Sequence, residues 1–256
     1  MDLQLSGKTV LITGSGHGIG LGIATTFLEE GARVVVTDIN KTVLDEACSF
    51  LIKAFGNNCF LGFCGDLTNE SVFEECVKSS ISIFGSLDVL ICNIGSGRSK
   101  MGLEASLDDW KRMFEINVFS AVTAVRACSS KISEGGSIIF IASIAGIQAL
   151  KAPYAYSAAK AGILSFVKNL SDDLADNKIR VNAIAPGNVM FPGSTWDNKI
   201  KEDLVGTQEY IDQNVPLKKF ATPSDIGSVA AFLASSKAQF ITGSCIPVDG
   251  GQLRSI

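Results

Sequence analysis

The feature that most constrains this chain is the segment Lys8–Leu28, where a short apolar run is followed by five closely spaced glycines. The unbroken run Val10-Leu11-Ile12 is typical of a strand buried on both faces of a parallel sheet. The glycines stand at positions 14, 16, 18, 20 and 22, and apolar residues then recur at helical spacing. The segment therefore predicts a strand, a glycine-rich turn and a helix.

This order of elements suits the binding of a phosphate group. Glycine allows a sharp turn and leaves main-chain N–H groups accessible, and the N-terminus of a helix adds partial positive charge. The strict pattern G-x-G-x-x-G is absent, and the loop reads Thr13-Gly14, three residues, then Gly18-Ile19-Gly20. A flexible surface loop is the alternative, but the position between strand and helix favours dinucleotide binding.

An acidic residue, Asp38, ends the second apolar run, Val34–Thr37. In a strand-helix-strand unit, a carboxylate here accepts hydrogen bonds from the adenosine ribose. It would repel a 2′-phosphate, so the sequence predicts NAD as the cofactor and makes NADP less favoured. Arg33 or Lys41 could soften this discrimination, and the alternative is that Asp38 only caps the following helix.

The composition limits the class of protein. The 256 residues are 46% hydrophobic and 19% charged, which indicates a globular chain. A net charge of −4 argues against nucleic acid or an anionic membrane as a partner. Seven cysteines without a C-x-x-C pair and a single histidine predict reduced cytoplasmic thiols and no metal site. We expect neither a signal peptide at Met1–Gln4 nor a membrane span, because the apolar-rich stretch Gly135–Leu150 is too short and too polar.

Predicted strands and helices alternate along the chain, without a linker or repeat. This alternation predicts an α/β fold, with one doubly wound parallel sheet of about seven strands and helices on both faces, formed by a single domain over residues 1–256. Further strands are predicted near 59–63, 89–91, 138–142, 179–184 and 245–248. Helices are predicted at 41–55 with Asn40 as cap, from Thr68 to 84, over 106–130, over 153–174 and from Thr222 to 235, and the segment 186–214 is the least regular.

Two side chains with acid–base potential follow the strand predicted at 138–142. Tyr156 and Lys160 share one helix face, and Ser143 ends the strand. Lowering the tyrosine pKa from about 10 to about 7 requires about 4 kcal/mol. An ammonium about 4 Å away, at an effective dielectric constant of about 20, supplies that much. Such pairs also occur on helices without function, and Tyr154 is a rival aromatic. The combination with Ser143 and the glycine loop nevertheless predicts proton transfer by Tyr156.

Together these motifs resemble those of the short-chain dehydrogenase/reductase family, in its compact single-domain branch. The resemblance covers Leu5–Gly251 and implies a Rossmann-type fold. It implies that Tyr156 is the catalytic acid/base, that Lys160 lowers its pKa and binds the nicotinamide ribose, and that Ser143 positions the substrate. It also implies that Asn117 holds a water in a proton relay with the lysine.

The resemblance further implies a set of cofactor contacts. Asp66 corresponds to the residue that holds the adenine ring, and Pro186-Gly187 to the turn beside the nicotinamide. We interpret His17 as a loop residue beside the phosphates rather than an acid/base. The complete set expected to bind NAD is Gly14, Gly16, His17, Gly18, Ile19, Gly20, Asp38, Ile39, Asp66, Leu67, Asn93, Gly95, Tyr156, Lys160, Pro186, Gly187 and Val189.

One motif departs from the family pattern. After the fourth strand the family usually has Asn-Asn-Ala-Gly, whereas this chain has Cys92-Asn93-Ile94-Gly95. We expect altered packing near the cofactor rather than loss of activity. Cys92 is not expected to act as a nucleophile, because no histidine lies near it in sequence.

The substrate-binding lid of the family corresponds to about residues 188–214. Its apolar residues either cover an apolar or sugar-ring face of the substrate or only pack the lid onto the body. Arg98 and Lys100 could likewise meet a polar or anionic group or remain solvated. The candidate substrate contacts are Ser143, Gln148, Tyr156, Met190, Phe191 and Trp196.

Three functions follow from these features. The first is an NAD-dependent dehydrogenase that acts on a secondary alcohol or ketone, with a sugar or other polyhydroxy compound as the small-molecule substrate. The second is a 3-oxoacyl thioester reductase that uses NADPH, against which Asp38 argues. The third is a non-catalytic regulator that senses NAD, for which an intact set of Ser143, Tyr156 and Lys160 would be unnecessary. An epimerase of the longer branch is not expected, since its C-terminal domain has no room here.

We also expect a homotetramer or homodimer, as is usual in the family. The helices predicted at 106–130 and 153–174 commonly form its main interface. Apolar residues on both helices agree with this expectation, although core packing explains them equally well.

Overall fold

The structure is a computed structural model that describes residues 1–254. Its centre is one sheet of seven strands, all parallel, in the order β3-β2-β1-β4-β5-β6-β7. The predicted doubly wound sheet is therefore confirmed, and the strand order reverses direction between β1 and β4. The strands are β1 (Thr9–Ile12), β2 (Arg33–Asp38), β3 (Phe60–Cys64), β4 (Leu87–Cys92), β5 (Ile132–Ile141), β6 (Arg180–Pro186) and β7 (Cys245–Val248).

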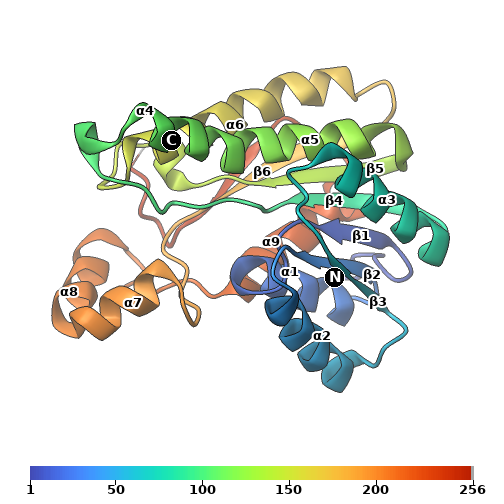
Figure 1. Ribbon diagram of the computed structural model, residues 1–256, viewed down its shortest axis with the longest axis horizontal. Coiled ribbons are helices and arrows are strands. Elements are labelled where there is room, and N and C mark those ends of the chain that lie inside the picture. Colours follow the sequence, from blue (N-terminus) through green and yellow to red (C-terminus); the bar gives the residue numbers. More distant parts are fainter. Residues whose placement is uncertain (255–256) are drawn as a thin grey trace.

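Helices cover both faces of the sheet (Figure 1). One face carries α1 (Gly18–Glu29), α2 (Lys41–Phe55) and α9 (Pro223–Ala234). The other carries α3 (Glu70–Phe84), α4 (Leu107–Phe114), α5 (Ser120–Cys128) and α6 (Tyr154–Asp173). Among the described residues, no helix combines the length and the apolar character that crossing a membrane requires.

The central strands have apolar side chains on both faces because each face is covered. Every residue of β1 and β4 is buried. Leu11 packs into the apolar cluster under α3, α5 and α6, whereas Val10 and Ile12 pack into the cluster under α1 and α9. This alternation is what the two-residue period of a strand requires, and it explains why the sequence shows an unbroken apolar run.

The helix starts follow their capping residues. Asn40 caps α2 by accepting from the main-chain N–H of Thr42, as predicted. Ser106 and Thr222 form capping boxes at the starts of α4 and α9. The cap predicted for the helix at 68–84, Thr68, was wrong: Asn69 caps α3, and the Thr68 hydroxyl donates to Asp66 instead.

The long helix predicted at 106–130 is not continuous. A π-helical turn, Glu115–Phe119, separates α4 from α5. Asn117 lies in this turn, and its Nδ2 donates to Met113 O at 3.0 Å. In a continuous α-helix that carbonyl would accept from the main-chain N–H of Asn117. The periodicity of apolar residues does not report such an insertion.

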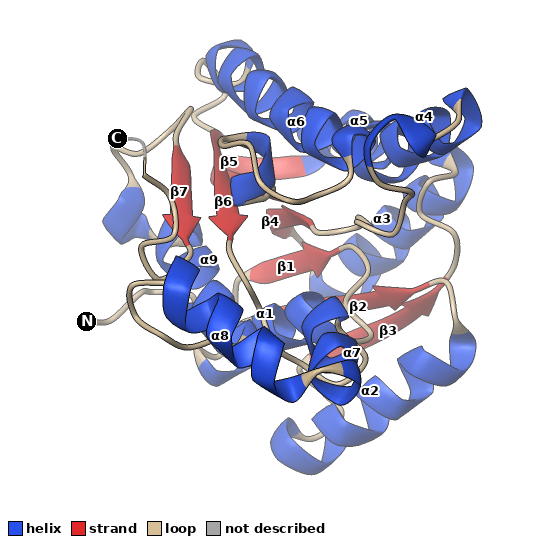
Figure 2. Ribbon diagram, turned by 90° about the vertical axis from the view of Figure 1, so that its left-hand side faces the viewer, coloured by secondary structure: helices blue, strands red, loops and turns tan. Residues whose placement is uncertain are grey.

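The segment predicted to be irregular, 186–214, in fact contains two helices, α7 (Thr195–Glu202) and α8 (Leu204–Asn214). Ser194 and Asp203 cap them. Both helices lie together outside the sheet (Figure 2). We call the segment 188–214 the lid.

Candidate active site

The carboxyl ends of the parallel strands open into one cleft of about 940 Å³. Parallel α/β sheets bind ligands at this edge, where the strand order reverses. Residues from the loops after β1 to β6 and from the lid line it. The predicted residues that line it are Gly14, His17, Gly18, Ile19, Gly20, Asp38, Ile39, Asp66, Leu67, Asn93, Gly95, Ser143, Tyr156, Lys160, Pro186, Gly187, Val189, Phe191 and Trp196.

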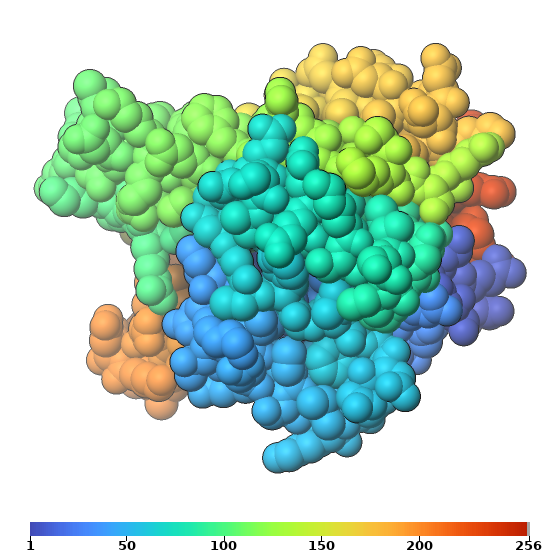
Figure 3. All heavy atoms as spheres, turned by 45° about the vertical axis from the view of Figure 1, so that its right-hand side comes forward, coloured from blue at the N-terminus to red at the C-terminus, as the bar shows by residue number. Residues whose placement is uncertain are grey.

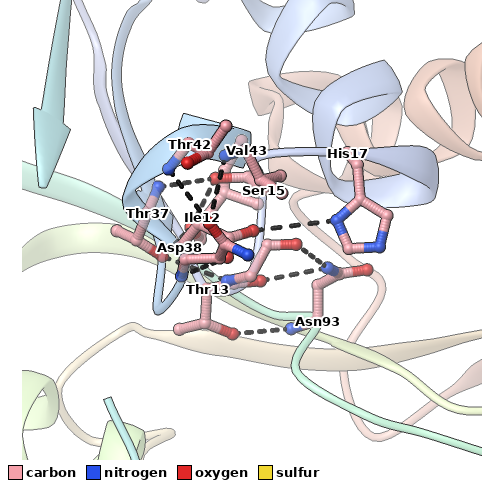
Figure 4. Close-up of polar contacts among 11 residues, drawn as sticks. Ile12, Thr13, Ser15, His17, Thr37, Asp38, Thr42, Val43 and Asn93 are labelled. Atoms are coloured by element: carbon pink, nitrogen blue, oxygen red, sulfur yellow. Dashed lines mark hydrogen bonds and ion pairs between the residues drawn. The ribbon is translucent and has the colours of Figure 1, made fainter. Parts of the chain in front are cut away.

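The glycine loop is held in place by the end of β4 (Figure 4). Asn93 Nδ2 donates to Thr13 O at 3.0 Å and to Gly14 O at 2.8 Å, while Asn93 N donates to the Thr13 hydroxyl. A Cβ on Gly20 would lie 2.5 Å from Gly14 O, so a larger residue would displace the main chain. Because Gly20 has no side chain, it can pack directly against the main chain at Gly14, and this contact shapes the loop.

The start of α1 fits a bound phosphate. The helices α2, α3, α4 and α9 each have a capping side chain, whereas α1 has none and has no acidic residue in its first turn. The first N–H groups of a helix need partners. At α1 they face the cleft beside Gly18 and Ile19, where a dinucleotide pyrophosphate would supply those partners.

Asp38 lies at the end of β2 and is 8% exposed. Its Oδ1 accepts from Asn40 N at 2.8 Å, and its Oδ2 lies 3.7 Å from His17 Nδ1. A Cβ on Gly16 would lie 2.6 Å from Oδ2, so Gly16 contacts Asp38 instead of lining the cleft. The side chain that caps α2 is Asn40, which removes the reading of Asp38 as the helix cap.

His17 and Asp38 shift each other's pKa. The interaction with the Asp38 carboxylate, 3.7 Å away, raises the pKa of His17 above its ordinary value, although burial opposes this shift. Burial would raise the pKa of Asp38, but the interaction with His17 and the hydrogen bond from Asn40 N outweigh it, so the pKa is lowered. Asp38 is therefore ionised at neutral pH and carries its charge toward the cleft.

Asp66 and Leu67 follow β3 at the same edge of the sheet. Asp66 Oδ1 accepts from Thr68 N at 3.0 Å and from the Thr68 hydroxyl at 2.7 Å. Leu67 is buried in the core beneath. The loop is thus shaped by its own hydrogen bonds, with Asp66 at the cleft wall.

Lys160, Tyr156 and Ser143 meet at the other side of the cleft. Lys160 Nζ is buried, donates to Ile141 O at 2.8 Å and lies 5.8 Å from the centre of the Tyr156 ring. Burial lowers the pKa of Lys160 to about 8. Tyr154, the rival aromatic, is 54% exposed and does not line the cleft.

The pKa of Tyr156 corrects one expectation. In the protein alone, burial raises this pKa above its ordinary value, while the neighbouring Ser143 hydroxyl acts in the opposite direction. The predicted lowering assumed an ammonium about 4 Å from the phenol. Lys160 instead directs a hydrogen bond to the main chain of β5, and its own charged form is disfavoured.

Asn117 lies behind these groups and is 1% exposed. Its Oδ1 accepts from Ser96 N and its Nδ2 donates to Ser96 O, which fixes the loop after β4. A Cβ on Gly95 would lie 2.7 Å from Asn117 Oδ1 and 3.1 Å from Lys160 Nζ. Gly95 therefore separates the amide from the ammonium, and only glycine leaves this space open.

The motif that departs from the family pattern is accommodated without strain on the loop. Cys92 is buried in the apolar core under α3, α5 and α6, and this burial raises the pKa of its thiol. Such a thiol is a poor nucleophile. Ile94 lines the cleft, and its Cγ1 would lie 3.1 Å from a Cβ on Gly14. Ile94 therefore packs beside Gly14 without strain, whereas a side chain at position 14 would crowd it.

The lid contributes an aromatic cluster to the cleft. Trp196 stacks on Tyr210 with ring centres 5.2 Å apart and contacts Phe220 at 5.4 Å. Phe191 meets the His17 ring edge to face, with centres 6.4 Å apart. In the space-filling view the lid helices (orange) project beneath the segment near residue 100 (green) (Figure 3).

Two predicted substrate contacts do not reach the cleft. Gln148 Oε1 accepts from Arg254 N, because the C-terminal segment passes beside it. Met190 Sδ accepts from the Ser194 hydroxyl within the lid. Arg98 and Lys100 also do not line the cleft.

The sequence reasoning missed three groups that the structure brings to the lid. Lys151 and Lys199 line the cleft, and Gln252 connects the lid to the C-terminal segment. Gln252 Oε1 accepts from Asn188 Nδ2, and its Nε2 donates to Tyr210 OH. Helical spacing between Trp196 and Lys199 was the only available signal.

Comparisons with known proteins agree with this site. A family model described as enoyl-(acyl carrier protein) reductase matches residues 14–252. The chain is 34% identical to 3-oxoacyl-(acyl-carrier-protein) reductase FabG of Chlamydia pneumoniae, over 98% of this chain and 99% of that protein. It is 33% identical to 7α-hydroxysteroid dehydrogenase of Escherichia coli K12, over 100% and 98%.

Solved structures agree as well. L-Sorbose reductase from Gluconobacter frateurii, complexed with NADPH and L-sorbose, matches with a TM-score of 0.93 and 34% identity over 100% of both chains. A structure of 7α-hydroxysteroid dehydrogenase with NADH matches with a TM-score of 0.87 and 30% identity, covering 99% of this chain and 97% of the other. The chain therefore belongs to the short-chain dehydrogenase/reductase family of oxidoreductases.

Proposed function

We propose that this protein transfers a hydride between C4 of NAD(H) and the carbon of a secondary alcohol or ketone. The observation that carries this proposal is the shared cleft, in which Tyr156, Lys160 and Ser143 lie opposite the glycine loop and Asp38. NAD, when bound, supplies the hydride acceptor or donor. A regulator that only senses NAD would need the glycine loop and Asp38, but it would not need Tyr156, Lys160 and Ser143.

Each catalytic candidate then has a defined task. Tyr156 exchanges a proton with the substrate oxygen, for which a raised pKa in the protein alone favours the donor form. Ser143 donates a hydrogen bond to the same oxygen. Lys160 places a positive charge beneath the nicotinamide ribose and stabilises the tyrosinate. Asn117, which bonds Ser96 in the loop after β4, would hold a water in a proton relay with the lysine.

Asp38 supports NAD over NADP. A 2′-phosphate would approach an ionised carboxylate that is 8% exposed and held by Asn40 N. His17 is the only nearby group whose protonation would offset that charge among the described residues. The preference for NAD over NADP is therefore expected to be strongest at a pH above the pKa of His17, and this pKa is itself raised from the ordinary value of histidine.

A polyhydroxy compound is the substrate class that we favour. The aromatic faces of Phe191 and Trp196 line the cleft, and the sorbose reductase with the same fold was solved with a sugar. The alternative is a 3-oxoacyl thioester reductase that uses NADPH, which the similarity to FabG favours.

Assembly and location are part of the same proposal. Apolar residues remain exposed along α4 and the turn after it, including Leu107 and Phe119. We expect a cytoplasmic homotetramer or homodimer that covers them. Sedimentation that finds only a monomer would refute the expected assembly.

The cofactor proposal is tested by calorimetry with NAD⁺ and NADP⁺ at about pH 8.5, where the His17 imidazole carries less charge than at neutral pH. The wild type is expected to bind NAD⁺ at least about tenfold tighter (~1.4 kcal/mol), and Asp38→Ala to lose this preference. Asp66→Ala is the matched control, because it removes a carboxylate from the same edge of the sheet. Equal or tighter binding of NADP⁺ by the wild type would favour the alternative function, a 3-oxoacyl thioester reductase that uses NADPH.

The hydride-transfer proposal is tested by the substitution Tyr156→Phe. The variant is expected to bind NADH like the wild type but to lose activity on secondary alcohols by about 10²–10⁴-fold. Tyr154→Phe is the control, because that ring lies outside the cleft. Full activity of Tyr156→Phe would contradict the assignment.

A further inference from the structure

The charges in the cleft are segregated along the sheet. The carboxylates that line it are, among the described residues, Asp38 after β2 and Asp66 after β3. Both strands lie on one side of β1, whereas Ser143 and Tyr156 follow β5 on the other side. The half of the cleft that faces the adenosine is thus acidic, and the half that faces the substrate has no acidic lining residue in residues 1–254.

Two exposed ammonium groups also line this cleft. Lys151 precedes α6 and Lys199 lies on α7, and both line the same cleft as Tyr156. Neither lysine forms an ion pair within the described part of the chain. Two cations without acidic partners in one cleft favour the binding of an anion there.

Lys199 is positioned by the aromatic cluster of the lid. Its Nζ lies 4.4 Å from the centre of the Trp196 ring, which stacks on Tyr210. A cation–π contact of this kind orients an ammonium without neutralising its charge. The ammonium can therefore still bind an oxyanion while the indole face covers the carbon chain of the same ligand.

A comparison within α7 shows that this arrangement is particular to Lys199. Lys201, two residues further on, pairs with Asp197 at 2.8 Å and does not line the cleft. Asp197 also accepts from Gly193 N, so this carboxylate is already engaged. Of the two lysines of α7, only Lys199 lines the cleft.

We propose that the substrate carries an anionic oxyacid group, a carboxylate or a phosphate, which Lys199 and Lys151 bind while Tyr156 faces the reacting alcohol or ketone. This inference rests on the proposed function and narrows it, from any polyhydroxy compound to an acidic one. The shared chemistry is a compact anion at one end of a polar carbon chain, with the reacting carbon nearer the nicotinamide.

The experiment uses three probes that differ in charge: gluconate, its uncharged counterpart glucitol, and a hexitol monophosphate. Each is titrated by calorimetry into the protein saturated with NADH, with which an alcohol cannot react, and into the protein without cofactor. At least one anionic probe is expected to bind about tenfold or more tightly than glucitol. Which anion binds better distinguishes a carboxylate from a phosphate.

The substitutions assign the effect to the lid. Lys199→Gln is expected to remove most of the preference for the anion, and Lys151→Gln a smaller part. Lys201→Gln removes the same charge from the same helix but should leave anion binding unchanged. NADH affinity should stay the same in all three variants, because the anion that these lysines are proposed to bind belongs to the substrate and not to the cofactor.

Three results would overturn the inference: equal binding of gluconate and glucitol, no anion binding up to about 10 mM, or unchanged anion binding in Lys199→Gln. Failure of the proposed function has a different signature, because Tyr156→Phe would then keep full activity or the wild type would prefer NADP⁺, whatever the anionic probes do.

A ligand-free measurement checks the charge directly. In a Trp110→Phe background, iodide should quench Trp196 fluorescence more strongly than in the same background with Lys199→Gln, whereas neutral acrylamide should quench both equally. Identical iodide quenching would show that Lys199 does not attract anions at this place.

Discussion

The two halves of the cleft are built in different ways. The cofactor half is fixed by main-chain contacts: a Cβ on Gly20 would strike Gly14 O, and the Asn93 amide bonds the carbonyls of the same loop. The substrate half is fixed by side chains, with Trp196 stacked on Tyr210 and Gln252 bonded to the Tyr210 hydroxyl. The shape of the cofactor half thus depends on main-chain atoms, whereas the shape of the substrate half depends on side chains, which substitutions can change.

This difference explains how one fold can keep its cofactor and change its substrate. Substitutions in the glycine loop meet main-chain atoms that cannot move without disturbing β1 and β4. Substitutions in the lid meet other side chains at the protein surface, where variation is tolerated. The residues between the two halves, Gly95 and Lys160, should therefore be the most sensitive to change.

Gly95→Ala is expected to lower activity strongly. The added methyl would lie 2.7 Å from Asn117 Oδ1 and 3.1 Å from Lys160 Nζ, so both groups would shift. A displacement of this size can lower kcat by about 10²-fold. Steady-state kinetics measures it. Gly97→Ala is the control, because its Cβ would make an ordinary contact of 3.7 Å with the Tyr156 ring. Equal losses in both variants would contradict the role of Gly95.

Lys160→Met should inactivate the enzyme and stabilise the fold at pH 7, by about 1–3 kcal/mol. Burial lowers the pKa of Lys160 to about 8 from an ordinary value of 10.5. Below pH 8 the native state therefore bears the full cost of a buried ammonium. Between about pH 8 and 10.5 the unfolded chain binds the extra proton, so wild-type stability rises with pH.

Denaturant unfolding at about pH 7 and about pH 9.5 measures this difference. The gap between Lys160→Met and the wild type should narrow at the higher pH. A variant that is less stable than the wild type at pH 7 would show that the hydrogen bond to Ile141 O outweighs the burial of the charge.

Gln252→Ala should weaken only the substrate half. Gln252 is 5% exposed and bonds both Asn188 and Tyr210, so its loss leaves buried polar groups unpaired at a cost of about 1–2 kcal/mol. We expect a rise in KM without a change in NADH affinity. Gln208→Ala on α8 is the control, because Gln208 bonds only the exposed Asp212. A matching loss of NADH affinity would show that the two halves are coupled.

The smallest effect concerns His17, the single histidine of the chain. Its pKa should lie above the ordinary value and should fall in Asp38→Ala, since the interaction with the Asp38 carboxylate is the main cause of the shift. Because the native pKa is raised, this pair stabilises the fold below the unfolded pKa of His17 and loses that effect as the pH rises through the native pKa. NMR titration of the imidazole measures the shift, and Asp66→Ala should leave it unchanged.

The sequence by itself determined the sheet and most of the cofactor half. The apolar runs, the cap Asn40 and the glycine loop are local signals, because each depends on residues within a few positions of one another. Asp38 could be recognised in the same way, since its place at the end of β2 follows from the run before it.

Only the tertiary structure decided the substrate half and the centre of the site. Gly95, Asn117 and Lys160 meet because three separate elements converge, and no local periodicity reports that convergence. The π-helical turn at Asn117 has the composition of an ordinary helix. Gln148 contacts the C-terminal segment, and Lys199 lines the cleft. The direction of such surface side chains depends on neighbours that are distant in sequence, and these neighbours come close only when the chain folds.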